Sequence, residues 1–212
     1  MPANRTMKSA FASLTILFAG LHLCFAAGKQ LTGAHAPAAT PALAPAEAEN
    51  KFIVPPGFEV RLFAAEPDVV NPVAMTWDER GRLWVLELYE YPLGAPPGQK
   101  GRDRIKILED TDNDGRADKV TVFADGFSLA TGLALGNGGV YVGQAPDLLF
   151  LQDTNHDDKA DTRQVLLTGF GLEDRHELLN GFTWGPDRWL YMTHGGYTRS
   201  KVKIPDATEP GS

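Results

Sequence analysis

The chain has 212 residues, of which 22% are charged, and a formal net charge of -7. This composition is ordinary for a globular protein, and the length allows one domain with a tail. The acidic balance argues against nucleic-acid binding, because contacts to phosphates need clustered Lys and Arg side chains.

Residues 1–26 have the pattern of a secretory signal peptide. Arg5 and Lys8 precede an uncharged apolar run over 10–25, and Cys24-Phe25-Ala26 offers small residues at the positions that determine cleavage. The run is short for a membrane span, which needs about 20 residues; a retained anchor is the alternative. We expect an exported protein, periplasmic or extracellular, that reaches a membrane only if this segment stays uncleaved.

Residues 27–50 are predicted to be a linker, because Ala and Pro dominate the stretch 36–45. Cys24 is the only cysteine, and it lies in the segment predicted to be removed. The mature chain is therefore expected to have no disulfide, no cysteine-ligated zinc and no Cys-x-x-Cys-His attachment, and so no haem.

From residue 51 to residue 204 the sequence predicts short β-strands separated by turns. Apolar and polar residues alternate, or form short apolar runs, at 58–63, 104–107, 120–123, 140–142 and 165–167. Clusters of Gly, Asn and Asp separate these runs, and no stretch has the 3.6-residue apolar period of a helix. The predicted fold class is all-β.

An internal repeat with an offset of 43 residues indicates the architecture. Residues 105–127 align with residues 148–170 without a gap. A second phrase at 77–85 recurs at 184–192 and, in a shorter form, at 135–142, and each copy predicts a strand, a tight turn and a strand. A period of about 40–50 residues with four strands per unit is typical of β-propeller blades, which bury both faces by stacking around an axis.

Residues 51–204 suffice for about three to four blades of four strands, whereas closed propellers have about four to eight blades. The last residues, 205–212, form a polar tail. The sequence therefore predicts an incomplete propeller, either the N-terminal fragment of a longer protein or a truncated reading frame. Four tryptophans recur with the repeat and are expected to pack between blades: Trp77, Trp84, Trp184 and Trp189.

Two acidic loops at equivalent positions of the repeat are candidate calcium sites. Oxygen ligands are offered by Asp110, Asp112, Asp114 and Asp118 in the first loop and by Asp153, Asn155, Asp157 and Asp161 in the second. Calcium binds about six to eight oxygens, and neither loop has the bidentate Glu of an EF-hand, so weak affinity is expected. The alternative is a pair of solvated hairpin turns, because Asp and Asn side chains bond the nearby backbone.

Segment 173–181 places several ionisable groups just before a predicted strand. His176 is the candidate general base, since an unperturbed histidine titrates near neutral pH; the alternative is a solvated histidine on a surface loop. Two alternatives exist for residues 194–196, His-Gly-Gly: they line the central channel of the predicted propeller together with segment 173–181, or they form a glycine turn, which we favour. The sequence has no Gly-x-Ser-x-Gly, no Walker loop and no dinucleotide fingerprint.

The phrases at 52–60, 62–67 and 71–75 resemble the opening of a group of secreted propeller proteins from planctomycetes and verrucomicrobia, usually called membrane-bound dehydrogenase-type proteins. Their propeller is similar to that of glucose and sorbosone dehydrogenases that depend on pyrroloquinoline quinone. The first acidic loop and the phrase Trp-Gly-Pro-Asp at 184–187 also fit this group. The resemblance covers about residues 52–196.

The resemblance implies a quinone-dependent dehydrogenase of sugars or alcohols. In such enzymes a histidine shortly before a Phe-Gly-Pro-Asp-like strand takes the hydroxyl proton, and a hydride passes to the quinone. His176 is the matching residue, although its spacing to Trp184 is one residue longer here. Pyrroloquinoline quinone is thus expected by resemblance only, with its Lys and Arg ligands in later blades outside this chain, and relatives often carry further C-terminal domains. The alternatives are a non-catalytic propeller that binds a carbohydrate or protein, and a gene fragment without function.

Overall fold

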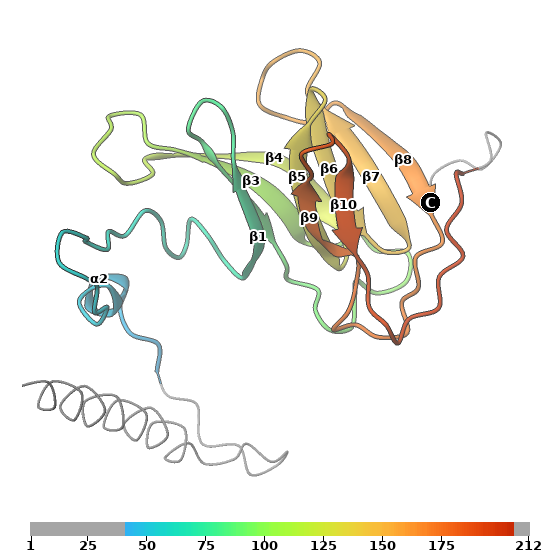
Figure 1. Ribbon diagram of the computed structural model, residues 1–212, viewed down its shortest axis with the longest axis horizontal. Helices are drawn as coiled ribbons and strands as arrows, with labels where there is room; N and C mark the ends of the chain where they lie inside the picture. The colour runs from blue at the N-terminus through green and yellow to red at the C-terminus, as the bar shows by residue number, and fades with distance from the viewer. Residues whose placement is uncertain (1–40, 206–212) are drawn as a thin grey trace, which may run out of the picture. The chain divides into compact units, whose positions relative to one another are not determined.

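The structure is a computed structural model that describes residues 41–205 (Figure 1). The predicted signal peptide, residues 27–40 of the predicted linker and residues 206–212 of the polar tail lie outside the described residues. Contacts divide the chain after Ala44, and all described helices and strands belong to the unit that begins at Pro45. None of the described helices has the length and apolar character needed to span a bilayer.

The described residues form three antiparallel sheets, which confirms the all-β prediction. The first sheet contains β1 (Pro72–Trp77), β2 (Leu83–Glu87), β3 (Asp103–Glu109) and β4 (Lys119–Phe127). The second contains β5 (Ala130–Gly136), β6 (Gly139–Gln144), β7 (Asp147–Gln152) and β8 (Thr162–Thr168). The third contains β9 (Asn180–Trp184) and β10 (Leu190–Thr193). The described strands do not close into a barrel.

Within each sheet the strands follow chain order, and each strand pairs with the next. The sheets lie beside one another in the order first, second, third, because β1 contacts β5 and β5 contacts β9 (Figure 1). Two sheets have the predicted four strands, whereas the third has two among the described residues. The described part therefore contains fewer complete four-stranded units than the three to four predicted.

The sequence repeat corresponds to equivalent strands of the sheets. The copies offset by 43 residues form β3 with β4 and β7 with β8, which are the third and fourth strands of their sheets. The three copies of the hairpin phrase form the first two strands of each sheet. All predicted strands from residue 104 onward are confirmed.

The predicted strand at 58–63 is wrong. This segment belongs to no sheet, because isolated hydrogen bonds rather than a ladder hold its backbone. The Ala117 N–H donates to the Phe63 carbonyl at 2.9 Å, and the Leu62 N–H donates to the Glu49 carboxylate at 3.0 Å. Glu49 ends the short helix α2 (Pro45–Glu49), which lies in the stretch predicted to be a linker.

The main core lies between the first and second sheets. Leu86 and Ile107 of the first sheet pack with Val142 and Leu149 of the second, and all four side chains are almost fully buried. Burial of one such side chain contributes about 1.5–3 kcal/mol, so this layer holds the two sheets together. A second cluster, which includes Leu178, fills the space beside the segment that leads into β9.

The tryptophans only partly pack as predicted. Trp84 is buried between the first and second sheets, and Trp184 donates from Nε1 to the Leu135 carbonyl of β5 at 2.7 Å. In contrast, Trp77 contacts Phe63 and stays half exposed, and Trp189 is 72% exposed. Packing between sheets therefore accounts for two of the four tryptophans, and the other two lie on surfaces that no described sheet covers.

Candidate functional site

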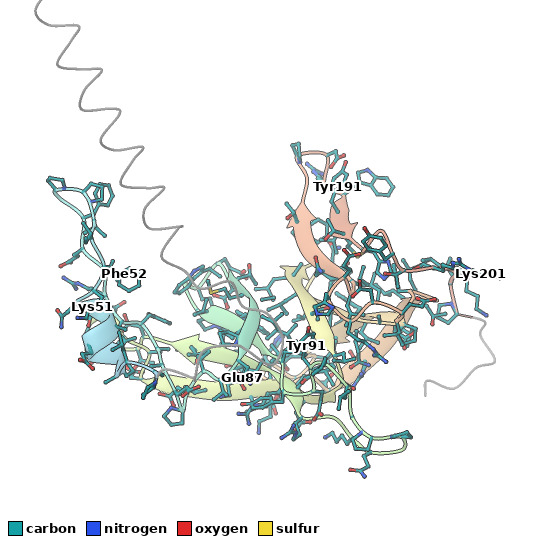
Figure 2. All side chains as sticks on the ribbon, turned by 90° about the horizontal axis from the view of Figure 1, so that it is seen from below. Lys51, Phe52, Glu87, Tyr91, Tyr191 and Lys201 are labelled. Atoms are coloured by element: carbon teal, nitrogen blue, oxygen red, sulfur yellow. The ribbon has the colours of Figure 1, made fainter. Side chains whose placement is uncertain are left out.

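A cavity of about 550 Å³ opens where the first strands of the three sheets lie next to one another. Its walls come from Ala74 of β1, Leu133 of β5 and Phe182 of β9. Its rim comes from two loops: the loop after β2 contributes Tyr91, and the loop before β9 contributes Arg175 and His176. Figure 2 labels Tyr91 on its loop. A volume of this size suits a small-molecule ligand.

His176 is held by its neighbour Asp174. The distance from His176 Nδ1 to Asp174 Oδ1 is 3.1 Å, and the His176 backbone N–H donates to the same oxygen at 2.9 Å. These hydrogen bonds, the backbone one first, lower the pKa of Asp174. An ionised carboxylate only accepts, so we assign the ring proton to Nδ1, which leaves the Nε2 lone pair free. The histidine side chain is 78% exposed and meets Tyr91 edge to face, with 5.9 Å between ring centroids.

The loop that carries His176 is supported by the segment after β10. The Gly195 N–H donates to the Glu177 carbonyl at 3.0 Å, and the Tyr197 N–H approaches the Glu177 carboxylate at 3.4 Å. A Cβ on Gly195 would overlap the Glu177 side chain, so glycine is needed at this position. Residues 194–196 therefore form a turn that packs on the loop, and the His194 ring lies against Phe170 rather than in the cavity lining.

Sequence reasoning identified His176 but missed Tyr91 and Arg175 as cavity residues. Arg175 could have been noticed, because it precedes the candidate base directly. Tyr91 had no signal, because it precedes His176 by 85 positions and belongs to no motif.

A family model described as "Domain of unknown function (DUF7133)" matches residues 44–210. The chain belongs to this DUF7133 family. No curated protein and no solved structure matches the chain. The DUF7133 match includes every described strand and both acidic loops, so the cavity lies within the family region.

In this DUF7133 chain a buried carboxylate, Asp103, connects two segments that border the cavity, the loop after β2 and the start of β5. It accepts hydrogen bonds from the backbone N–H groups of Tyr89 at 2.6 Å, Glu90 at 2.9 Å and Ala130 at 3.2 Å. Burial raises the pKa of Asp103 by more than these bonds lower it. Because Tyr91 follows Glu90 directly, Asp103 fixes the loop that carries Tyr91 to the start of β5.

A second buried carboxylate, Glu87 at the end of β2, lies in a network of charges. Its oxygens contact Lys106 Nζ at 2.9 Å and Arg104 Nε at 2.6 Å, and the Tyr89 hydroxyl donates to it at 3.0 Å. Burial alone would raise the pKa of Glu87, but the hydrogen bonds from Arg104 and Lys106 outweigh it and the pKa is lowered. Every charge in this network has a partner, which is what a buried ion pair needs to be tolerated.

The two acidic loops of the DUF7133 chain differ in how closely their carboxylates gather. In the first loop the ligand oxygens of Asp110, Asp112 and Asp118 all lie within 4.8 Å of one another, and Asp114 lies outside this group. Among the described residues the second loop, with Asp153, Asn155, Asp157 and Asp161, forms no such group.

Both loops have the hydrogen bonds expected of turns. Asp110 accepts from the N–H groups of Asp114 and Gly115, and Asp153 accepts from those of Asp157 and Asp158. The backbone therefore satisfies part of each carboxylate. A calcium ion remains a prediction, and the first loop is the better candidate.

Proposed function

We propose that the DUF7133 region is part of a β-propeller of the cell envelope, and that its cavity binds a hydroxyl-bearing small molecule such as a sugar or an alcohol. The sequential antiparallel sheets, the 43-residue repeat and the adjacent first strands support the propeller. In this arrangement the cavity lies beside the axis around which blades would stack, where β1, β5 and β9 come together.

The Asp174–His176 pair at the cavity is the observation that carries the proposal. The carboxylate orients the imidazole and stabilises its protonated form, as in other sites where an acid positions a histidine base. The free Nε2 then takes a proton from a bound hydroxyl. Apolar walls on three strands hold the carbon skeleton of the ligand.

Removal of a hydroxyl proton is one half of alcohol oxidation, and the resemblance to quinone-dependent dehydrogenases supports oxidation as the reaction class. Pyrroloquinoline quinone carries several carboxylates, which need several cationic partners. Arg175 is the only Arg or Lys among the described residues of the cavity lining. These residues do not fit that cofactor by themselves, so we derive no hydride-transfer step.

The exposure of His176 favours a second candidate function, a non-catalytic propeller that binds a carbohydrate or a protein. The imidazole is 78% exposed, whereas a base that takes a hydroxyl proton works best where water is excluded. Saturable binding of sugars without any turnover would support this alternative.

The test compares two variants of the protein isolated from the cell envelope, with dye-linked oxidation of sugars and alcohols as the readout. His176→Asn keeps an N–H donor near Asp174 but removes the base, and His176→Ala removes both. We expect both to lower turnover by about 10²- to 10⁴-fold, with ligand binding retained. Unchanged turnover in His176→Asn would remove the general-base role, and a chain that neither folds nor binds would favour the gene-fragment reading.

A further inference from the structure

We infer that the ligand of this cavity carries one carboxylate, which Arg175 binds. The inference rests on the proposed function, because it assigns a ligand class to the same cavity. Its basis is a half-buried arginine whose side chain has no partner among the described residues, at a cavity that no Asp or Glu of residues 41–205 lines.

Arg175 lies on the rim of the cavity and is half buried. Within residues 41–205 its guanidinium makes no hydrogen bond or ion pair. An arginine that is partly removed from water and left without an acceptor is costly, since its five N–H donors are strong. A ligand that supplies acceptors would recover this cost on binding.

The acids beside Arg175 are occupied elsewhere. The Glu173 carboxylate accepts the Arg199 N–H at 3.4 Å, Asp174 binds His176, and Glu177 accepts the Tyr197 N–H at 3.4 Å. Although the chain has a net charge of -7, no Asp or Glu lines the cavity within the described residues. Arg175 is therefore the only Arg, Lys, Asp or Glu side chain among the described residues that line the cavity.

The chemistry of the rim matches a single carboxylate. A guanidinium binds a planar carboxylate through two parallel N–H···O bonds, and the apolar walls formed by Val73, Leu133 and Phe182 reduce screening by water. One free guanidinium neutralises one negative charge, whereas a phosphate dianion or a polycarboxylate calls for more cations. Arg175 adjoins His176 in the chain, so carboxylate and hydroxyl would belong to one compact ligand, a hydroxy acid or a sugar acid.

The experiment measures binding by ligand-observed NMR to the protein isolated from the cell envelope. The probes are two matched pairs, glucuronate with glucose and lactate with propane-1,2-diol, which differ in one carboxylate. In at least one pair we expect the acid to bind about tenfold or more tightly than the neutral compound, because a charged hydrogen bond contributes that much. Added salt would weaken binding of the acid but not of its neutral counterpart.

Arg175→Gln is expected to remove the preference for the acid, and Arg175→Lys to keep only part of it. Arg116→Gln, on the exposed β3–β4 loop and outside the cavity lining, is the matched control and should leave the preference unchanged. Near-UV circular dichroism of each variant checks that it is folded. Equal affinity within both pairs, or a preference that survives Arg175→Gln in a folded protein, would overturn the inference.

The two proposals fail in different ways. If an acid binds in an Arg175-dependent way but no oxidised product forms, the general-base role of His176 is contradicted and the assignment of a carboxylate ligand is supported. If oxidation depends on His176 but the acid and the neutral compound bind with equal affinity, the general-base role is supported and the carboxylate assignment is contradicted.

Discussion

Glu87 and Asp103 are both fully buried, yet their pKa values move in opposite directions. Burial pushes both upward, since a low dielectric disfavours the charged form. Glu87 faces Arg104 and Lys106, whose hydrogen bonds reverse the shift, whereas Asp103 is bonded by backbone N–H groups and its pKa stays raised. The charge of the partner, more than the degree of burial, decides the direction.

Glu87→Gln should lower the free energy of unfolding by about 3–5 kcal/mol, because it leaves the buried Lys106 ammonium without its counter-charge. Urea denaturation measures the change. Glu109→Gln is the control, since its partner Lys119 is half exposed, and no comparable loss is expected. Equal effects of the two substitutions would contradict the role given to the Glu87 network.

Glu87 also gives the stability a defined pH dependence. Its folded pKa lies below its unfolded value of about 4.3, so its contribution is complete above that value and is lost as pH falls through the folded one. We expect the free energy of unfolding to decline below about pH 4, and to decline less in Glu87→Gln. Asp103 works in the opposite sense and is common to both proteins, so the difference between them isolates Glu87. If the free energy of unfolding depends on pH in the same way in both proteins, Glu87 is not the source of the pH dependence.

Gly195 and Gly196 form a matched pair for testing the support of the His176 loop. A Cβ at Gly195 would overlap Glu177, whereas a Cβ at Gly196 meets no atom within 4 Å. We expect Gly195→Ala to cost about 1–3 kcal/mol in thermal unfolding and to shift the NMR signals of residues 173–177. Gly196→Ala should do neither, and similar behaviour of the two variants would show that the contact is unimportant.

At the scale of elements, one ion pair joins the β1–β2 turn to the β7–β8 loop. Arg82 contacts Asp78 in its own hairpin and Asp158 in the other sheet, each at 2.7 Å. Asp158 adopts a left-handed φ of 63°, at the position where the first loop has Gly115. In the second loop the ion pair between Asp158 and Arg82 thus offsets an unfavourable backbone conformation at Asp158.

Substitutions at Asp158 separate these two contributions. Asp158→Gly and Asp158→Ala both lose the ion pair to Arg82, but only Ala keeps a side chain at the left-handed position. We expect the Ala variant to be less stable than the Gly variant by about 1 kcal/mol in thermal unfolding. Equal melting temperatures would mean that the loop relaxes to another conformation.

The calcium prediction concerns the first acidic loop. If an ion binds there, a chelator should lower the melting temperature and excess calcium should restore it. Asp112→Asn should abolish this response, because Asp112 belongs to the group of three clustered carboxylates, while Asp157→Asn in the second loop should leave it intact. If the chelator leaves the melting temperature unchanged, the two loops are solvated turns without calcium.

The sequence predicted the elements wherever the repeat supplied the pairing partner. Strands and hairpins from residue 104 onward were correct because two copies of the pattern supported each other. The strand predicted at 58–63 was wrong because alternation of apolar and polar residues also occurs in an extended segment outside a sheet. A strand needs a neighbouring strand with which to form a hydrogen-bond ladder. At the site, Asp174 lies two residues from His176, so their pairing follows from the local sequence. Tyr91 comes to the cavity, and Asp103 comes to Ala130 of β5, only through the packing of separate sheets.

At the scale of the whole unit, the outer edge of β10 has no pairing strand among the described residues. The last strands of the first two sheets are protected: β4 carries Lys119 and Asp125, and a bridge from Thr168 to Lys203 covers part of β8. β10 has the sequence Leu-Tyr-Met-Thr, without charge or proline, and such edges invite pairing with other chains. Figure 2 shows Tyr191 on this sheet, well away from Glu87 of the first sheet.

Tyr191→Lys should therefore reduce self-association of the protein at high concentration, because a charge on an edge strand disfavours intermolecular pairing. Sedimentation velocity over a concentration series measures the effect. Tyr197→Lys, at an exposed position outside any strand, is the control for added charge alone. If both variants change the sedimentation equally, net charge and not the edge is responsible.

The four tryptophans are intrinsic fluorescent probes of the first and third sheets, whereas the second sheet contains none. Trp77 and Trp84 belong to the first sheet, Trp184 and Trp189 to the third sheet and its turn, and the second sheet has no tryptophan. Trp84, at 6% exposure, should emit at short wavelength and resist iodide quenching, while Trp189, at 72%, should emit at long wavelength and be quenched first. Intrinsic fluorescence would therefore report unfolding of the first or the third sheet directly. Unfolding confined to β5–β8 would change the fluorescence only through Trp84 and Trp184, the two indoles that pack against the second sheet.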